Sequence, residues 1–285
     1  MLCFFIYSNM FLEIEKIYQK FNSRFAFLPN SPTTKLKLNK IIEKRRNIAV
    51  KNLIEDEDIK KIFKFYIENH KDIQDNQGTY KVLFLLQCLK ETDHLEGNII
   101  ELGSWKAGNA ILMAKFLQQI NSKKKIFACD TFDGVPSNDK FVYNKKGKGL
   151  FSNVNMEKIL EKIETFGVKK EITLIEGNFN NSLKQLENEK FSLVFLDCMI
   201  YDSAISAINF SYPKLSTNGI FISHCYGIKK DSHSFWGEGI AVNEYLSSKL
   251  EKIKIDTIPF FQKGCKEPKL NNIQPIDKYS NYCKI

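Results

Sequence analysis

The chain has 285 residues, of which 43% are hydrophobic and 26% are charged, and its net charge is +9. These proportions are typical of a globular protein, and they exclude a disordered chain, a fibrous repeat and a small disulfide scaffold. At roughly 100–200 residues per domain, we expect one large domain, or one domain with an extension.

The positive charge does not identify a partner. Lysines such as Lys158, Lys162 and Lys169 alternate with glutamates in amphipathic segments, so we interpret most of them as solvated helix faces. The sequence shows no helix-turn-helix, zinc-finger or aromatic RNA-binding pattern, so we expect no nucleic-acid partner. A preference for an anionic small substrate stays open.

The cellular location is inferred from cysteines and apolar runs. The seven cysteines form no C-x-x-C pair and no Cys/His metal spacing, which favours a reducing cytoplasm. No apolar run is long enough to predict membrane insertion. The apolar start, residues 1–5, lacks a basic region and a cleavage site, so we interpret it as the start of a helix rather than a signal peptide.

The first quarter of the chain shows helical spacing. Residues 9–69 carry apolar stripes at helical intervals, interrupted at 30–32, and the acidic segment 55–58 suits a helix start. A further helix is predicted over 79–92. We therefore expect a helical N-terminal extension over 1–77, which we hypothesise to cover the acceptor side of the site and to contribute to a homodimer.

From residue 98 onward, short apolar runs alternate with helical patterns. Continuous apolar runs are typical of strands buried on both faces, so residues 78–285 are predicted to form a doubly wound, mostly parallel α/β domain. Ligands of such sheets bind beyond the carboxyl ends of the strands. Strands are expected at 98–102, 125–129, 172–175, 192–196 and 219–223, and helices near 106–120, 154–166, 181–188, 202–210 and 238–252.

The first predicted strand ends in an acid and a glycine turn, Glu101-Leu-Gly103-Ser-Trp105. A dinucleotide site needs a second glycine where this chain has Trp105, so a nicotinamide-linked oxidoreductase is disfavoured. S-adenosylmethionine (SAM) carries no phosphate and needs only the open turn and an acid, here Glu101. A turn without any ligand is the remaining interpretation.

Polar residues also follow the other strands. Asp130 is placed to bind ribose hydroxyls, or is a turn residue. Asn178 and Phe179 suit either adenine binding or turn chemistry and core packing. Asp197 closes an apolar strand and faces the crevice. His224 is a candidate base, because imidazole titrates near neutrality, or else a structural histidine.

Together these motifs resemble the macrocin O-methyltransferase family, whose members use SAM to methylate sugar hydroxyls of antibiotics. The resemblance covers residues about 78–250. The helical N-terminal region matches only loosely. The motifs that carry the resemblance are Gly-Ser-Trp-Lys-Ala-Gly at 103–108, Asp-Thr-Phe-Asp-Gly-Val-Pro at 130–136, Gly-Asn-Phe at 177–179, Leu-Asp-Cys-Met-Ile-Tyr-Asp-Ser at 196–203 and His-Cys-Tyr-Gly at 224–227.

The resemblance implies a Rossmann-like class I SAM-dependent methyltransferase acting on a sugar hydroxyl, plausibly of a nucleotide-linked or surface-polysaccharide sugar. A non-catalytic binding protein and a methyltransferase for a non-sugar molecule are the alternatives. His224 is the expected base and Asp197 its partner. The expected SAM-binding residues are Glu101, Gly103, Ser104, Trp105, Gly108, Asn109, Asp130, Thr131, Phe132, Asn178, Phe179 and Asp197.

The chain departs from the family at the metal-binding positions. Members of the family use magnesium held by carboxylates at the fourth and fifth strand ends. Asp197 is retained, but Met199, His224 and Cys225 stand where the family has acids. A hard cation prefers oxygen ligands. The sequence therefore predicts a SAM site without metal ligands.

Overall fold

The computed structural model describes residues 56–73, 79–138, 148–226, 237–255 and 259–268. The chain divides into two compact units, residues 70–274 and residues 1–69 with 275–285. The predicted helices within 1–55 lie outside the described residues. Within the described ranges, no helix combines the length and apolar character needed to cross a bilayer.

The described part of the first unit belongs to helix α3, Glu57–Ile73. The Asp56 side chain caps this helix, because its Oδ1 accepts hydrogen bonds from the backbone N–H groups of Asp58 and Ile59, both at 3.0 Å. The acidic residues of the first turn, Glu57 and Asp58, also stabilise the helix, because their negative charges interact with the positive end of the helix dipole. The predicted helix start is confirmed.

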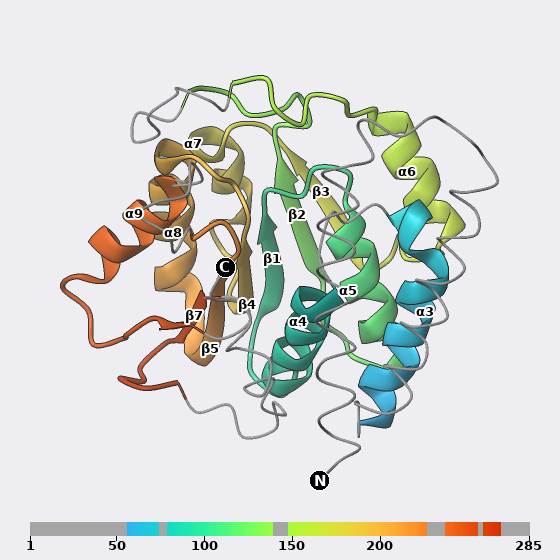
Figure 1. The fold of residues 1–285 in the computed structure, drawn as a ribbon, viewed down its shortest axis with the longest axis horizontal. Helices are drawn as coiled ribbons and strands as arrows, with labels where there is room; N and C mark the ends of the chain where they lie inside the picture. Colours follow the sequence, from blue (N-terminus) through green and yellow to red (C-terminus); the bar gives the residue numbers. More distant parts are fainter. Residues whose placement is uncertain (1–55, 74–78, 139–147, 227–236, 256–258, 269–285) are drawn as a thin grey trace, which may run out of the picture. The chain divides into compact units, whose positions relative to one another are not determined.

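The second unit is built on a seven-stranded sheet in the order β3-β2-β1-β4-β5-β7-β6 (Figure 1). Strands β1 to β5 are parallel, and β7 pairs antiparallel with both β5 and β6. The strands are β1 Asn98–Leu102, β2 Ile126–Asp130, β3 Ile172–Glu176, β4 Phe191–Leu196, β5 Leu215–Ser223, β6 Lys254–Ile255 and β7 Pro259–Gln262.

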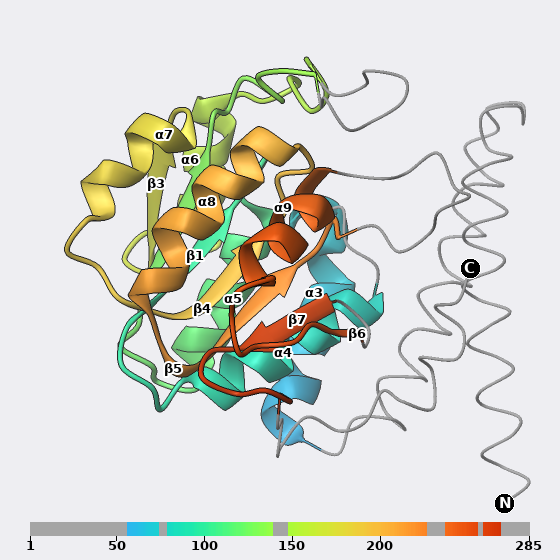
Figure 2. The same ribbon diagram turned by 90° about the vertical axis from the view of Figure 1, so that its left-hand side faces the viewer.

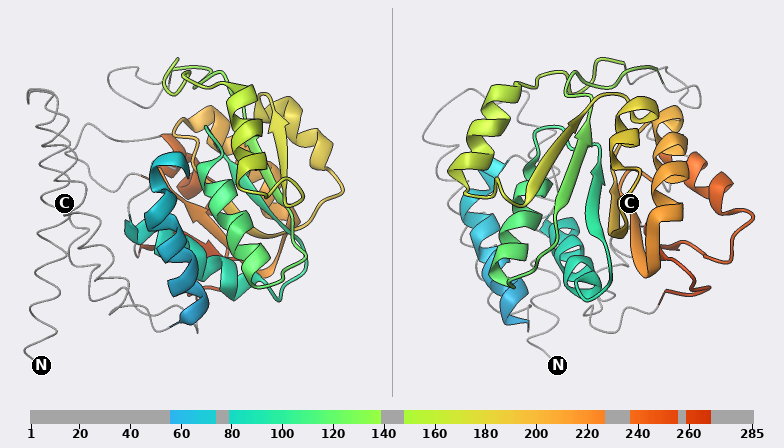
Figure 3. Two further views of the ribbon diagram at one scale, coloured as in Figure 1. Left: turned by 90° about the vertical axis from the view of Figure 1, so that its right-hand side faces the viewer. Right: turned by 180° about the vertical axis from the view of Figure 1, so that it is seen from behind.

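Helices cover both faces of the sheet. Helices α7, α8 and α9 lie on one face and α4, α5 and α6 on the other, which Figures 2 and 3 show from opposite sides. This coverage explains why β4 is buried at every position. The helices are α4 Thr79–Thr92, α5 Gly108–Gln119, α6 Met156–Thr165, α7 Phe179–Ser182, the 3₁₀ helix Leu183–Leu186, α8 Tyr201–Lys214 and α9 Gly237–Leu246.

The predicted fold class is confirmed, with three differences in detail. The helix expected at 238–252 ends at Leu246, where Ser247 N–H bonds to Glu244 C=O in a turn. The helix expected at 181–188 is one α-helical turn followed by a 3₁₀ turn. The antiparallel strands β6 and β7 were not predicted.

Strand register brings the candidate site together. Leu102 of β1, Leu196 of β4 and Ser223 of β5 are aligned across the sheet. The pairing extends one residue further, because Asp197 N–H donates to Leu102 C=O and His224 N–H donates to Leu196 C=O, both at 2.8 Å. Residues that follow three different strands therefore meet at one edge.

Candidate functional site

A cavity of about 410 Å³ opens at the carboxyl ends of the parallel strands, a size typical of small-molecule sites. The structure brings most of the predicted site residues to its wall. Glu101, Gly108 and Phe132 do not line it. The predicted residues that do are Gly103, Ser104, Trp105, Asn109, Asp130, Thr131, Asn178, Phe179, Asp197 and His224.

The turn after β1 approaches the chain after β4 so closely that it requires glycine. Gly103 has a φ of 104°, and a Cβ built on it would lie 2.0 Å from the carbonyl oxygen of Asp197. Its N–H donates to Cys129 C=O. Only a residue without a side chain allows the two loops to approach this closely.

Asp130 organises the loops on either side of the cavity. Its Oδ2 accepts from the N–H of Trp105 at 2.7 Å, and its Oδ1 accepts from the N–H of Phe132 at 2.9 Å. Trp105 and Phe132 both have positive φ values, of 45° and 52°, which an L-residue adopts only when its surroundings hold it there. Burial raises the pKa of Asp130 despite these hydrogen bonds.

Polar atoms without partners lie beneath the β1 turn. The Glu101 side chain is fully buried next to the side chains of Asn109 and Ser104, but neither of its carboxyl oxygens has a hydrogen-bond partner in good geometry among the residues that the structure describes. The same holds for Oδ1 of Asn109, which lines the cavity. Burial raises the pKa of Glu101 to about 8. Orphaned polar atoms next to a cavity fit a site whose ligand completes their hydrogen bonding.

Asn178 and Phe179, which follow β3, have the structural roles that the sequence analysis gave as alternatives to adenine binding, namely turn chemistry and core packing. Asn178 caps α7 by accepting a hydrogen bond from Asn180 N–H at 3.0 Å. The Phe179 ring is 9% exposed. Both also line the cavity, so these structural parts are compatible with ligand binding.

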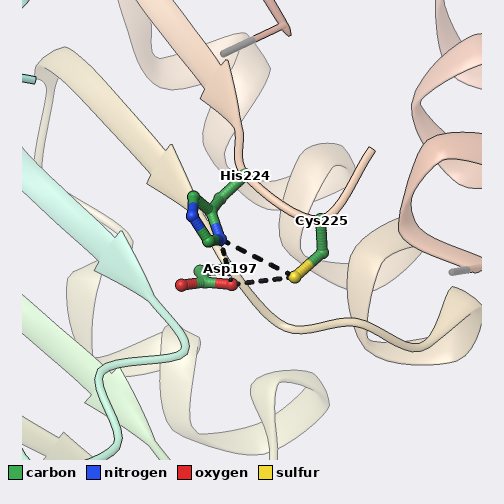
Figure 4. Close-up of side chains that lie close together, drawn as sticks. All are labelled: Asp197, His224 and Cys225. Atoms are coloured by element: carbon green, nitrogen blue, oxygen red, sulfur yellow. Dashed lines mark hydrogen bonds and ion pairs between the residues drawn. The ribbon is translucent and has the colours of Figure 1, made fainter. Parts of the chain in front are cut away.

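Three side chains from the ends of β4 and β5 point toward one another (Figure 4). Nδ1 of His224 is 2.9 Å from Oδ1 of Asp197, and the Cys225 thiol donates to the same oxygen at 3.0 Å. The Cys225 Sγ lies 3.8 Å from Nδ1 of His224. On the other side of the ring, Nζ of Lys81, in α4, lies 2.8 Å from Nε2.

These contacts assign the proton on the imidazole. The Lys81 ammonium can only donate, so it requires a lone pair on Nε2, and the ring proton is therefore on Nδ1, facing Asp197. Burial would raise the pKa of Asp197, but attraction to His224 and the surrounding hydrogen bonds outweigh it and lower that pKa below its usual value. Lys81 was not identified from the sequence, because it is separated from His224 by 143 positions.

A buried carboxyl group joins the two loops that carry these side chains. Oε1 of Glu238, in the first turn of α9, accepts from the Ser223 hydroxyl at 2.7 Å and from Cys225 N–H at 3.0 Å. Oε2 accepts from the N–H groups of Cys198 and Met199, at 3.0 and 3.3 Å. Burial raises the pKa of Glu238 to about 8. The chain after β4 and the chain after β5 are thus held by one side chain.

The side chains at this edge do not fit magnesium. Asp197 supplies a carboxylate, but the neighbouring groups are an imidazole, a thiol and the thioether of Met199, which also lines the cavity. Magnesium requires six oxygen ligands in near-octahedral geometry. The described side chains at this edge therefore lack the oxygen ligands that magnesium needs.

Comparison with protein families identifies the group to which this arrangement belongs. Residues 78–263 match the macrocin-O-methyltransferase (TylF) family model. The chain belongs to this family. Membership confirms the predicted resemblance and the predicted fold class, and it agrees with SAM as the cofactor, since macrocin O-methyltransferases take their methyl group from SAM.

Two curated relatives of this chain come from Streptomyces. One, from Streptomyces olivaceus, is an 8-demethyl-8-(2,3-dimethoxy-α-L-rhamnosyl)-tetracenomycin-C 4′-O-methyltransferase, 24% identical over 155 residues. The other, from Streptomyces niveus, is a demethyldecarbamoylnovobiocin O-methyltransferase, 22% identical over 159 residues. The matches cover 50% and 52% of this chain, and 59% and 61% of the relatives.

Solved structures of O-methyltransferases share the fold. The calicheamicin methyltransferase CalS11 aligns with a TM-score of 0.58 at 16% identity, over 85% of this chain and 96% of that chain. The O-methyltransferase NovP aligns with a TM-score of 0.56 at 20% identity, over 65% and 80%. These likenesses show that the chain shares the fold of these two methyltransferases.

Proposed function

We propose that this protein is a SAM-dependent O-methyltransferase that methylates a hydroxyl group of a sugar. Family membership and the names of the relatives support this class of reaction. The observation that carries the proposal is the Asp197–His224 pair on the wall of a cavity that also contains the glycine turn after β1. An acceptor and a methyl donor can both reach such a cavity.

The described residues fit the cofactor. SAM, when bound, supplies a methyl group already activated by its sulfonium. We assign its amino-acid part to the turn at Gly103 and Ser104, above the unpartnered carboxyl group of Glu101. Asp130, at the end of the neighbouring strand, is assigned to the ribose. The remaining predicted cofactor residues line the cavity around them, except the buried Gly108 and Phe132, which shape the loops.

His224 is proposed to accept the proton of the acceptor hydroxyl. Its Nδ1–H is held by Asp197, so the lone pair available to a substrate is on Nε2. Asp197 orients the ring and stabilises the imidazolium that forms. A positioned base contributes roughly 10²–10⁴-fold to the rate. Because Lys81 occupies Nε2 in this structure, the lysine must move to another acceptor before the hydroxyl can bind there.

An anionic acceptor molecule would best explain how Lys81 leaves the imidazole of His224. A phosphate or carboxylate group near the reacting hydroxyl would draw the ammonium away from Nε2. A nucleotide-linked sugar, or a charged sugar of a surface polysaccharide, has this property. We further propose that the protein acts in the cytoplasm and that it forms a homodimer.

The N-terminal region, residues 1–77, is proposed to cover the acceptor side of the site. A chain that starts near Thr79 should then lose acceptor turnover or solubility before it loses SAM binding. Full activity of the truncated chain would exclude this part of the proposal.

The variant His224→Ala tests the proposed chemistry. It should lower kcat by about 10²-fold or more while leaving the Kd for SAM near the wild-type value. Methyl transfer should also survive an excess of chelator. Loss of activity with chelator, restored by magnesium, would contradict this mechanism.

A further inference from the structure

We propose that Asp197, His224 and Cys225 form a binding site for a zinc-type divalent cation, and that this cation inhibits the protein. The binding site itself follows from the geometry alone. The inhibition rests on the proposed function, in which His224 is the base.

The three donor atoms are spaced as ligands of one small ion. Zinc binds thiolate sulfur at about 2.3 Å and nitrogen or oxygen at about 2.0–2.2 Å, so tetrahedral ligands lie roughly 3.3–3.7 Å from one another. Here the separations are 2.9 Å for Nδ1 to Oδ1, 3.0 Å for Sγ to Oδ1 and 3.8 Å for Sγ to Nδ1 (Figure 4). The two short separations are hydrogen bonds, whose protons the cation would replace.

The donor types select the cation. One carboxylate oxygen, one imidazole nitrogen and one thiolate sulfur suit zinc or cobalt and are poor ligands for magnesium or calcium. All three residues line the cavity, so a fourth coordination position faces its open space. Three protein ligands with one open position is the arrangement of zinc sites that exchange their fourth ligand.

Two residues around the three ligands have opposite effects on cation binding. Glu238 accepts a hydrogen bond from the backbone N–H of Cys225 and so anchors that ligand. Lys81 opposes the cation, because its Nζ contacts the outer nitrogen of His224. When the cation occupies Nδ1, Nε2 must carry the ring proton, and a donor would then face the ammonium. Lys81 must turn away for the cation to bind.

Binding of the cation releases one proton to solvent and moves a second proton within the imidazole ring. The thiol of Cys225 loses its proton to solvent as the sulfur bonds to the cation, and the ring proton of His224 moves from Nδ1 to Nε2. No oxidation or reduction takes place. The imidazole then has no lone pair for a hydroxyl proton, so methyl transfer stops while the SAM residues at the β1 turn are unaffected.

Titration of the full-length protein with Co²⁺ and Zn²⁺ tests the site without using activity. The wild type should bind one ion, and Co²⁺ should produce a thiolate-to-cobalt charge-transfer band. Cys225→Ser should abolish the band and weaken Zn²⁺ binding at least about tenfold, while Cys198→Ser, which changes a neighbouring cavity cysteine outside the site, should leave both unchanged. Lys81→Met should tighten Zn²⁺ binding.

Two results would overturn the proposal. One is the absence of a charge-transfer band in the wild type, which does not depend on whether any variant folds. The other is equal Zn²⁺ affinity in the wild type and Cys225→Ser. Inhibition is measured in a separate activity assay. The Zn²⁺ concentration that halves methyl transfer should be at least about tenfold lower for the wild type than for Cys225→Ser. A protein that binds Zn²⁺ through Cys225 but never transfers methyl groups would refute the proposed function and leave the metal site standing.

Discussion

The ammonium of Lys81 and the imidazole of His224 are in direct contact, with Nζ 2.8 Å from Nε2. This contact fixes the ring tautomer and covers the nitrogen that we propose as the base. The contact therefore links acceptor binding to chemistry: the hydroxyl can reach Nε2 only after the lysine has found another partner.

Replacing Lys81 by methionine separates these two effects. For an anionic acceptor, Lys81→Met should raise KM by about tenfold or more, the usual effect of losing a charge-assisted hydrogen bond. The kcat should not fall, because Nε2 is then uncovered, and Lys81→Arg should restore part of the affinity. Steady-state kinetics at saturating SAM measure this. A lower kcat at unchanged KM would mean that Lys81 takes part in the chemical step instead.

Glu238 should affect catalysis through the loops that it joins. Glu238→Gln places an amide N–H₂ group against backbone donors, which should loosen the Asp197–His224 pair and lower kcat at nearly unchanged SAM affinity. Glu251 offers a matched control: it is 3% exposed and accepts from the Tyr212 hydroxyl and Gly264 N–H, and it does not line the cavity.

Glu238→Gln should lose about 1–3 kcal/mol of unfolding free energy, because both oxygens of Glu238 accept hydrogen bonds and an amide nitrogen leaves the donors on one side unsatisfied. Glu251→Gln keeps the one oxygen that accepts both of its hydrogen bonds, so it should lose less. Only Glu238→Gln should lower kcat and shift the pH profile of kcat. Equal loss of kcat in the two variants would reduce Glu238 to a general contributor to stability.

Glu101 should make the stability of the free protein depend on pH. Its pKa is about 8 in the fold against 4.5 for the ordinary carboxyl group. Between these values the unfolded chain has released the proton and the folded chain retains it, so the free energy of unfolding should fall as pH rises. Glu101→Gln removes the part of this dependence that Glu101 contributes, while Glu238, whose pKa burial also raises to about 8, keeps its own part in both proteins.

At about 1.4 kcal/mol per pKa unit, Glu101→Gln should gain on the order of 5 kcal/mol relative to the wild type between pH 4.5 and pH 8. Urea unfolding without SAM at several pH values measures the difference. A constant difference across that range would show that Glu101 ionises normally in the fold.

Asp130→Ala should weaken SAM binding by about 1–3 kcal/mol, the usual effect of losing a hydrogen bond to a charged group. Part of this loss should come from the loop, because the Trp105 and Phe132 N–H groups lose their acceptor. Asp130→Asn keeps one oxygen for them and should therefore bind SAM with intermediate affinity. Calorimetry on the wild type and the two variants measures the SAM affinity. An unchanged affinity in Asp130→Ala would show that Asp130 does not bind SAM.

The sequence predicted the features that depend on local patterns. Each of the five parallel strands contains a short apolar run, and the polar residues that follow the strands lie at one edge because parallel strands share a direction. Asp197 and His224 could be placed in this way, since each directly follows such a run.

Contacts between distant segments could not be predicted. Lys81 reaches His224 from a helix before the sheet, and Glu238 reaches Ser223 and Cys225 from a helix after it. From the sequence alone, Lys81 is expected on the exposed side of a helix and Glu238 in the first turn of another. Neither position indicates a contact with the strand ends. Strands β6 and β7 were also missed, because they are short and pair antiparallel at the edge.

The most direct test of the central claim is transfer of an isotopically labelled methyl group from SAM to sugars. A panel of nucleotide-linked sugars and free glycans, neutral and anionic, would be incubated with the wild type and His224→Ala, and products detected by mass spectrometry. We predict a singly methylated sugar from the wild type, favoured among anionic acceptors, and at least about 10²-fold less from the variant. SAM binding without methylation of any sugar in the panel, or equal methylation by the two proteins, would contradict the account.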